Sequence, residues 1–268
     1  MRASTLKVMN CGTSFNIAMR FALSVLVWIL SILVVLILFP VSLIIWFITY
    51  PFDEERRIFH KWMLIHGIII SWMIPLRRIK VEGRDKYNKD QTYIIVSNHQ
   101  SILDILILNR LRYRFRWISK IENMKVPVLG WYLLMAKYIT IDRGNPESKA
   151  LMMQKSLESI RKRISIMIFP EGTRSLNGQL GPFKLGAFQL AIMADKPVLP
   201  VIVDGTGNIL PKHGIVFGPG NVIRLKVLDP IYPGSFGTGD PEELAVKLRN
   251  LMTEELEKLR NETGIGDQ

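Results

Sequence analysis

An uncharged apolar stretch lies near the start of the chain: residues 21–51, about 31 in all, contain no Asp, Glu, Lys or Arg. About 20 apolar residues already span the hydrocarbon core of a bilayer, so this stretch is too long for the core helix of a soluble domain. It also differs from a secretory signal, because its apolar part is about twice the usual length and no small-residue cleavage site follows. The stretch therefore predicts a membrane-embedded helical anchor.

The internal organisation of this anchor follows from its proline and from a second apolar run. Pro40 is predicted to break or kink the helix and so divide the stretch into residues 21–39 and 41–50. The second run, residues 62–75, is short for a full span. Two arrangements are open: either the first run crosses the membrane, or both runs form a helical hairpin buried in one leaflet. Residues 1–77 are predicted to form the anchor.

Residues typical of membrane interfaces occur along and beside both runs. They are the basic residues Arg20, Arg56, Arg57, Lys61, Arg77, Arg78 and Lys80 and the tryptophans Trp28, Trp46, Trp62 and Trp72. The whole chain has a formal net charge of +12, which calls for an anionic partner. Because 49% of the residues are hydrophobic, we expect anionic lipid as that partner and no nucleic acid. The single cysteine, Cys11, excludes an internal disulfide and a multi-cysteine metal site.

After residue 77 short apolar runs alternate with helical patterns, which is typical of an α/β domain. Strands are predicted at 78–82, 93–97, 115–119, 138–141, 164–169, 198–203 and 222–228. Helices are predicted at 102–111, 126–136, 146–162, 184–194 and 241–262. We therefore predict that residues 78–268 form an α/β domain, with a mixed, largely parallel sheet and flanking helices.

A histidine, His99, follows the strand 93–97, and Asp104 comes five residues later. On one continuous helix these side chains would lie roughly 140° apart, at about 100° per residue. They meet only if His99 lies in the turn and Asp104 points back from the first turn of a helix that Ser101 caps and that opens at Ile102. The carboxylate then fixes the imidazole tautomer and leaves the other nitrogen as a general base. A histidine simply satisfied at a strand end is the alternative.

Charged residues follow three other predicted strands. Lys120 comes after strand 115–119, Arg143 comes after strand 138–141, and Arg174 lies in the segment after strand 164–169. If these strands are parallel, their carboxyl ends share one edge of the sheet, where α/β proteins bind ligands. His99 and the three cations are then predicted to converge on one crevice.

The segment after strand 164–169 reads Phe-Pro-Glu-Gly-Thr-Arg-Ser. Gly172 lets the backbone turn closely, and the planar guanidinium of Arg174 suits a phosphate. Glu171 is predicted to hold this arginine or a substrate hydroxyl. A surface turn with a solvated charge pair is the alternative for this segment.

The order of these motifs resembles the glycerophospholipid acyltransferase family, specifically the lysophosphatidic acid acyltransferases (1-acyl-sn-glycerol-3-phosphate acyltransferases). The resemblance covers roughly residues 78–204, and the apolar N-terminus is similar to the membrane anchor of bacterial members. It rests on His99-x4-Asp104, Lys120, Asp142-Arg143, the segment from Phe169 to Ser175, Phe183-Lys184-x-Gly186-Ala187 and Val198-Leu199-Pro200-Val201.

The resemblance implies a reaction and a role for each motif residue. His99, oriented by Asp104, would take the proton from the sn-2 hydroxyl of lysophosphatidic acid, which attacks the thioester of acyl-CoA or acyl carrier protein directly and gives phosphatidic acid. No acyl-enzyme, metal or other cofactor is implied. Lys120 and Arg174 would hold the acceptor's phosphate, and Arg143, Glu171 and Gly172 would support that site.

The expected partners are lysophosphatidic acid, an acyl thioester and the lipid bilayer, with acyl carrier protein as an alternative donor. The expected location is the bacterial cytoplasmic membrane with the catalytic domain facing the cytoplasm. The chain departs from the family pattern at Lys137 and Thr140, where glycine and phenylalanine are usual. Three other functions are alternatives: acylation of another lysolipid, a thioesterase in which His99 activates water, and a non-catalytic protein that binds anionic lipid.

Overall fold

The structure is a computed structural model that describes residues 3–74, 78–219, 222–235, 237 and 239–262. Two parts of the sequence prediction, the end of the second apolar run at residue 75 and the basic residue Arg77, lie outside the described residues. The predicted boundary after residue 77 adjoins the same gap.

Seven strands form one sheet: β1 (Arg78–Glu82), β2 (Ile94–Ser97), β3 (Phe115–Lys120), β4 (Ile139–Ile141), β5 (Ser165–Ile168), β6 (Val198–Asp204) and β7 (Val222–Val227). The strand order is β1-β7-β6-β2-β5-β3-β4. Strands β2 to β6 run parallel to one another, whereas β7 is antiparallel to β6 and parallel to β1. The predicted mixed, largely parallel sheet is confirmed, and the carboxyl ends of β2, β3, β4 and β5 lie at one edge.

The described part of this domain contains six α-helices: α3 (Leu103–Leu108), α4 (Leu129–Met135), α5 (Pro146–Arg161), α6 (Gly186–Ala194), α7 (Thr206–Ile209) and α8 (Pro241–Asn261). Helix α3 begins one residue later than predicted and continues as a 3₁₀ turn, Asn109–Leu111. Helix α4 begins three residues late, since Val126 is extended and Val128 has φ +65°, and neither conformation is helical. Helix α7 was not predicted, since four residues are too few to show a helical period.

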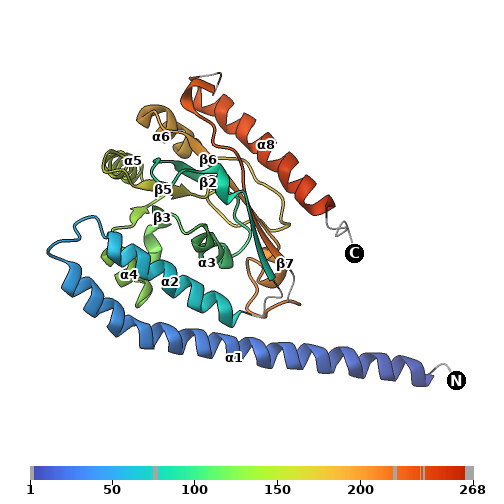
Figure 1. Cartoon of the computed structure of the whole chain (residues 1–268). Coiled ribbons are helices and arrows are strands. Elements are labelled where there is room, and N and C mark those ends of the chain that lie inside the picture. The colour runs from blue at the N-terminus through green and yellow to red at the C-terminus, as the bar shows by residue number, and fades with distance from the viewer. Residues whose placement is uncertain (1–2, 75–77, 220–221, 236, 238, 263–268) are drawn as a thin grey trace.

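The two faces of the sheet are covered by different helices (Figure 1). Helix α3 packs on the face that includes Ile95 and Met167. Helices α5, α6 and α8 pack on the opposite face, which includes Ile94 and Ile166. Adjacent residues of a strand point to opposite faces, so β2 and β5 are buried on both sides and read as continuous apolar runs.

Two helices precede the sheet: α1 (Ala3–Thr49) and α2 (Arg57–Met73). Helix α1 continues through Pro40, so the prediction that this proline breaks the helix is wrong. Contacts just beyond the proline hold the helix in place, because the buried Ser42 hydroxyl accepts a hydrogen bond from Trp62 Nε1 (2.7 Å) and lies 3.0 Å from the Tyr132 hydroxyl. Packing of this kind lets apolar helices tolerate proline.

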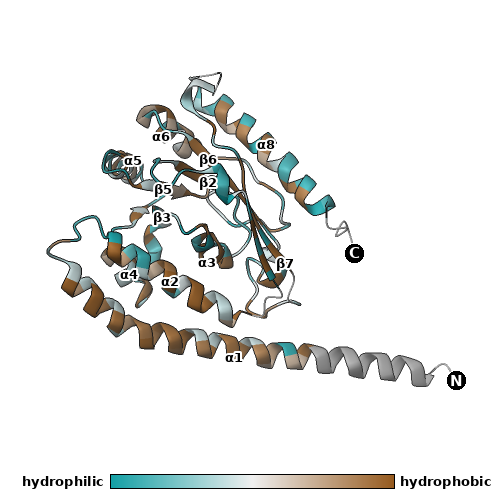
Figure 2. Ribbon diagram, in the orientation of Figure 1, coloured by the Kyte–Doolittle hydropathy of each residue, from teal (hydrophilic) through white to brown (hydrophobic). Residues whose placement is uncertain are grey.

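The polarity of α1 is inverted relative to a helix on a soluble protein (Figure 2). Its outward face is apolar, with Leu33, Ile37 and Phe47 being 47%, 67% and 76% exposed, whereas the polar side chains of Ser42 and Thr49 are buried. Residues Ile17–Thr49 form a helix of 33 residues that is long and apolar enough to cross a membrane. At 1.5 Å per residue it is about 50 Å long, which exceeds the ~30 Å hydrocarbon core.

The C-terminal part of helix α1 also lies against the α/β domain, while its N-terminal part projects beyond the domain (Figure 1). Near its middle, Trp28 Nε1 donates to the Ile215 carbonyl (2.8 Å), and the Phe217 amide donates to Ser24 Oγ (2.9 Å). Further along, Phe39 packs on Tyr132 of α4. The helix is therefore fixed to the domain at two places within its apolar part.

Candidate active site

The turn after β2 is held by the side chain of Asn98, which is buried. Its amide donates to the Val203 carbonyl and accepts from the Val203 amide of β6, both at 2.8 Å. This pair continues the β2–β6 ladder by one residue, so the next residue, His99, leaves the sheet at a fixed point.

Asp104 lies in the first turn of α3 and its carboxylate points back to the turn, as the spacing required. Asp104 Oδ2 is 2.8 Å from His99 Nδ1 and accepts hydrogen bonds from the amides of Gln100 (2.7 Å) and Ser101 (2.9 Å). The Thr206 hydroxyl of α7 donates to the other oxygen at 2.5 Å. The carboxylate is fully buried, and these four donors compensate for the water it has lost.

Ser101 serves this turn and is not placed as a nucleophile. Its hydroxyl donates to the Leu210 carbonyl (2.6 Å) and accepts from the Leu103 amide (3.3 Å). Together with the bond from its own amide to Asp104, this is the reciprocal pattern of a capping box.

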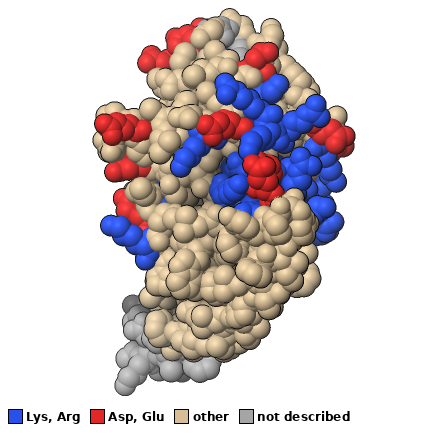
Figure 3. Space-filling view, turned by 90° about the vertical axis from the view of Figure 1, so that its left-hand side faces the viewer, with Lys and Arg blue, Asp and Glu red and all other residues tan. Residues whose placement is uncertain are grey.

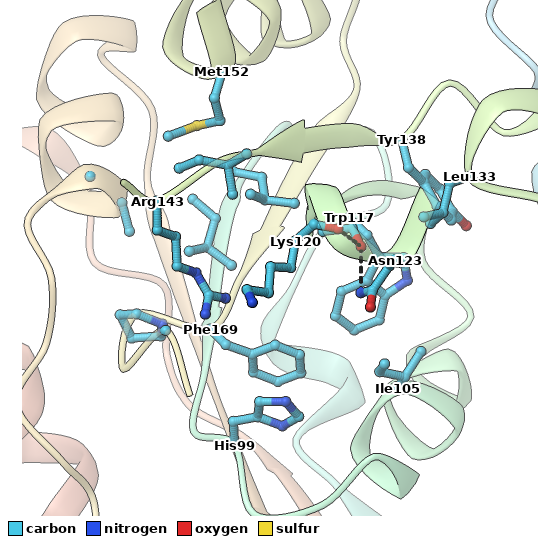
Figure 4. Close-up of a pocket in the computed structure, with 18 of the residues that line it drawn as sticks. His99, Ile105, Trp117, Lys120, Asn123, Leu133, Tyr138, Arg143, Met152 and Phe169 are labelled. Atoms are coloured by element: carbon cyan, nitrogen blue, oxygen red, sulfur yellow. Dashed lines mark hydrogen bonds between the residues drawn. The ribbon is translucent and has the colours of Figure 1, made fainter. Parts of the chain in front are cut away.

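The imidazole of His99 is held flat by aromatic stacking (Figure 4). Its ring lies 3.9 Å from that of Phe169 at an interplanar angle of 9°, and Phe169 stacks in turn on Trp117. Only Nδ1 is hydrogen-bonded to the described residues, and the side chain is 16% exposed. The arrangement therefore leaves Nε2 available to a ligand in the adjoining cavity.

Glu171 has a different role from the predicted one. Its carboxylate accepts from the backbone amides of His99 and Gly181, both at 2.9 Å, and it makes no bond to Arg174. Burial raises the pKa of this carboxyl, while the two amide hydrogen bonds act in the opposite direction. Glu171 therefore connects the loop after β5 to the histidine turn. No bond to Arg174 occurs among the described residues, and the alternative expectation, that Glu171 holds a substrate hydroxyl, stays a prediction.

A cavity of about 1190 Å³ opens at this edge of the sheet. His99, Lys120, Arg143 and Gly172 line it, so the structure brings these four predicted residues together. Figure 4 shows Lys120 and Arg143 pointing into the same space, above the rings of Phe169 and His99. Lys120 Nζ also forms an ion pair with Glu122 Oε1 at 2.6 Å, and Glu122 does not line the cavity.

Arg174 is the predicted cation that the structure does not place on the cavity wall. It lies on the same loop as Glu171 and Gly172, is half-buried, and forms no ion pair or hydrogen bond with the described residues. Gly172 has φ +68°, and a Cβ there would lie 3.0 Å from Cε of Lys184. Glycine is needed at this position both for the backbone conformation and for this close approach.

Apolar residues line the cavity on both sides of the sheet edge, and we call each group of them an arm. One arm is formed by α2, α3 and α4, with Ile70, Ile105 and Leu133. The other is formed by α5 and α6, with Met152 and Ile192. Apolar arms on either side of a histidine and a group of cations suit ligands that combine hydrocarbon chains with phosphate.

Three residues at this site were missed as site residues from the sequence: Thr206, Lys149 and Lys184. Thr206 reaches Asp104 from 102 positions away, which no local pattern reveals. Lys149 and Lys184 line the cavity from α5 and from the segment before α6. The signal for Lys184 was its place in the Phe183-Lys184-x-Gly186 segment.

The fold and the site define a class: a mixed α/β protein in which a carboxylate-oriented histidine faces a largely apolar cavity at the carboxyl edge of parallel strands. A sequence model of the family described as Acyltransferase matches residues 78–204. The chain belongs to this acyltransferase family.

Several named proteins are similar to the chain. The chloroplastic 1-acyl-sn-glycerol-3-phosphate acyltransferase BAT2 of Brassica napus is 38% identical over 184 residues, covering 68% of this chain and 53% of the relative. The 1-acyl-sn-glycerol-3-phosphate acyltransferase of Saccharomyces cerevisiae is 34% identical over 194 residues, covering 70% and 63%. The alpha form of Homo sapiens is 31% identical over 192 residues, covering 71% and 66%. The chain thus spans about half to two thirds of the length of these relatives.

The fold also matches a solved structure, that of the 1-acyl-sn-glycerophosphate acyltransferase PlsC from Thermotoga maritima. The TM-score is 0.77 at 24% identity, covering 94% of this chain and 99% of that chain. The match includes the region of α1 and α2, since it extends over nearly the whole chain.

Replacing Thr206 tests the network around Asp104. Thr206→Val keeps the side-chain shape but removes the hydroxyl donor, so one oxygen of a buried carboxylate loses its partner. A hydrogen bond to a charged group contributes about 1.5–3 kcal/mol, and we expect a loss of unfolding free energy of that size. Denaturant unfolding in detergent measures it. Thr206→Ser keeps the hydroxyl and should unfold like the wild type; equal stability of all three proteins would contradict the assigned bond.

Proposed function

We propose that the protein transfers an acyl group from a thioester, either acyl-CoA or acyl carrier protein, to the sn-2 hydroxyl of lysophosphatidic acid, giving phosphatidic acid. The carrying observation is the His99–Asp104 pair, with Nδ1 bonded and Nε2 facing a cavity that has cations and two apolar arms. The names of the related proteins support the same acceptor.

The reaction uses His99 twice. Nε2 takes the proton of the sn-2 hydroxyl as its oxygen attacks the thioester carbonyl, and the carbon–sulfur bond then breaks. The departing thiolate takes that proton back from the imidazolium, so the histidine is regenerated. Asp104 stabilises the imidazolium and fixes its tautomer, as the carboxylate of a catalytic triad does.

The acceptor's phosphate is assigned to the cations at the strand ends. Lys120 and Arg143 point into one space beside the His99 ring (Figure 4). Arg174, half-buried and without a partner among the described residues, lies on the loop that adjoins them. A guanidinium binds a phosphate with two parallel hydrogen bonds, so an arginine free of internal ion pairs is suited to this role.

The protein is proposed to attach to the membrane by a hairpin of α1 and α2 in one leaflet. A helix that crosses a bilayer leaves the water-exposed domain behind, whereas α1 stays bonded to the domain at Ser24 and Trp28 as well as at Ser42. Figure 3 shows an uncharged surface over the lower part of the molecule, where α1 lies, with lysines and arginines gathered above it. This distribution fits an apolar face in the acyl chains and a basic zone at the headgroups. Because thioester donors are cytoplasmic, the domain is placed on the cytoplasmic face of a bacterial membrane.

The assay that tests this function offers purified protein a labelled acyl thioester with lysophosphatidic acid, glycerol 3-phosphate, a neutral lysolipid or no acceptor. Acylation that depends on lysophosphatidic acid is the expected result. Hydrolysis without an acceptor would indicate a thioesterase, preference for a neutral lysolipid would reassign the acceptor, and no turnover would favour a lipid-binding protein.

Replacing His99 removes the proposed base. General bases contribute about 10²–10⁴ in rate, so His99→Ala should lower the acylation rate by that factor with little change in unfolding temperature. His213→Ala is the matched control, because His213 is exposed and outside the cavity. Acylation by folded His99→Ala protein at the wild-type rate would refute the assignment.

Replacing Arg174 tests its part in acceptor binding. Arg174→Ala should raise the KM for lysophosphatidic acid by about tenfold or more, since a charge-assisted bond is worth about 1.5–3 kcal/mol. The KM for the thioester should be unchanged. Arg161→Ala, an exposed arginine at the end of α5, serves as the control. An unaltered acceptor KM would assign the phosphate to Lys120 and Arg143 alone.

The membrane arrangement is tested by labelling cysteines in sealed vesicles with an impermeant maleimide. Cys11 precedes the apolar part of α1, and a Lys89→Cys variant adds an exposed thiol on the α/β domain. The hairpin predicts that both thiols react from the same side. Reaction from opposite sides, with both thiols labelled after permeabilisation, would establish that α1 crosses the membrane.

A further inference from the structure

The cavity carries more positive charge than one lysophosphatidic acid requires. Four cationic side chains line it, from Lys120, Arg143, Lys149 and Lys184, and no acidic side chain of the described residues does. The acceptor has a single phosphate with at most two negative charges, and Lys120 and Arg143 lie beside the imidazole where that phosphate must sit. Lys149 and Lys184 therefore remain without an anion.

These two lysines share a position in the fold. Lys149 lies on α5 and Lys184 directly precedes α6, and these helices pack together on the sheet face opposite α3. Figure 1 shows that this face points away from α1 and α2. Both lysines are exposed, and neither forms an ion pair with the described residues. A ligand that reaches them arrives from water, whereas a lysolipid arrives from the membrane side.

The backbone of Lys184 is fixed to the loop that carries Glu171. Its amide donates to the Pro170 carbonyl at 2.8 Å, and its Nζ is 3.1 Å from where a Cβ of Gly172 would be. The ammonium thus lies against the glycine turn whose neighbour, Glu171, holds the His99 amide. Lys184 is therefore placed at the rim of the reaction centre by the same loop that positions the base.

We infer that Lys149 and Lys184 form a binding site for the phosphate of the acyl donor. This inference rests on the acyltransferase function proposed above. Acyl-CoA and acyl carrier protein both carry their thioester on a phosphopantetheine arm, so both place a phosphate outside the reaction centre. The chemistry recognised is a phosphate ester at the water-facing mouth of the α5–α6 arm, which the lysines bind as charge-assisted donors.

The test compares donors that have and lack the phosphate. Lys184→Gln and Lys149→Gln are assayed with a palmitoyl thioester of CoA, of phosphopantetheine and of N-acetylcysteamine, which has no phosphate. We expect the KM for the CoA donor to rise about 10- to 100-fold in Lys184→Gln, with unchanged kinetics for the N-acetylcysteamine donor and for lysophosphatidic acid. Lys155→Gln, which removes an exposed charge from α5 outside the cavity, should behave as wild type.

The outcomes separate the possible roles. A raised KM for both the CoA and the phosphopantetheine donors assigns the site to the phosphopantetheine phosphate. A raised KM for the CoA donor alone assigns it to the nucleotide phosphates. An equal rise in the KM for the N-acetylcysteamine donor, or a raised KM for lysophosphatidic acid instead, would overturn the inference.

Calorimetric binding of free CoA gives a readout independent of turnover. The affinity should fall about 10- to 100-fold in Lys184→Gln and stay unchanged in Lys155→Gln. If the wild type acylates no lysophosphatidic acid, the proposed function fails, and this comparison still decides whether the lysines bind these phosphates. Equal CoA affinity in all variants would overturn the inference.

Discussion

The buried carboxylate of Asp104 is the interaction on which the site depends. A charge removed from water is costly unless its lone pairs are used, and here three donors meet one oxygen and a fourth meets the other. These donors come from the turn after β2 and from α7, so one side chain joins α3 both to the turn just before it and to a segment 102 positions away. The imidazole is held as a consequence of this network, and Glu171 fixes its backbone from the other side.

The sheet explains how scattered residues form one site. Because β2, β3, β4 and β5 are parallel, His99, Lys120, Arg143 and Phe169 all follow strand ends at one edge. The two apolar arms then lie on opposite faces of the sheet, under different helices. The histidine, the cations and the apolar walls of the cavity thus come together through one topological feature, the crossover connections that keep these strands parallel.

Much of this was predictable from the sequence, and the failures have physical causes. The strands were predicted to within one residue at each end, because β-branched runs bounded by polar turns are a local signal. The His99–Asp104 contact was expected on the condition that His99 lies in the turn and Asp104 in the first turn of the helix, which the structure meets. Pro40 was misjudged because the rule that proline breaks a helix neglects tertiary packing, which here comes from Trp62 and Tyr132.

The roles of Glu171 and Thr206 depend on contacts across 72 and 102 positions, which no local sequence pattern detects. Lys137 stands where glycine is usual in the family, and its φ is +54°. The residue type differs, but the backbone has the left-handed conformation that glycine favours.

The inverted polarity of α1 makes the surroundings of its outward face part of the protein's stability. Ser42 and Thr49 are buried while Leu33, Ile37 and Phe47 face outward, which is the pattern expected of a helix in apolar surroundings. Under the membrane attachment proposed above, lipid or detergent covers this outward face and takes the place of a packed protein surface. Exchanging one detergent or lipid for another then changes an interface of the protein, and it should shift melting behaviour and self-association without any change of sequence.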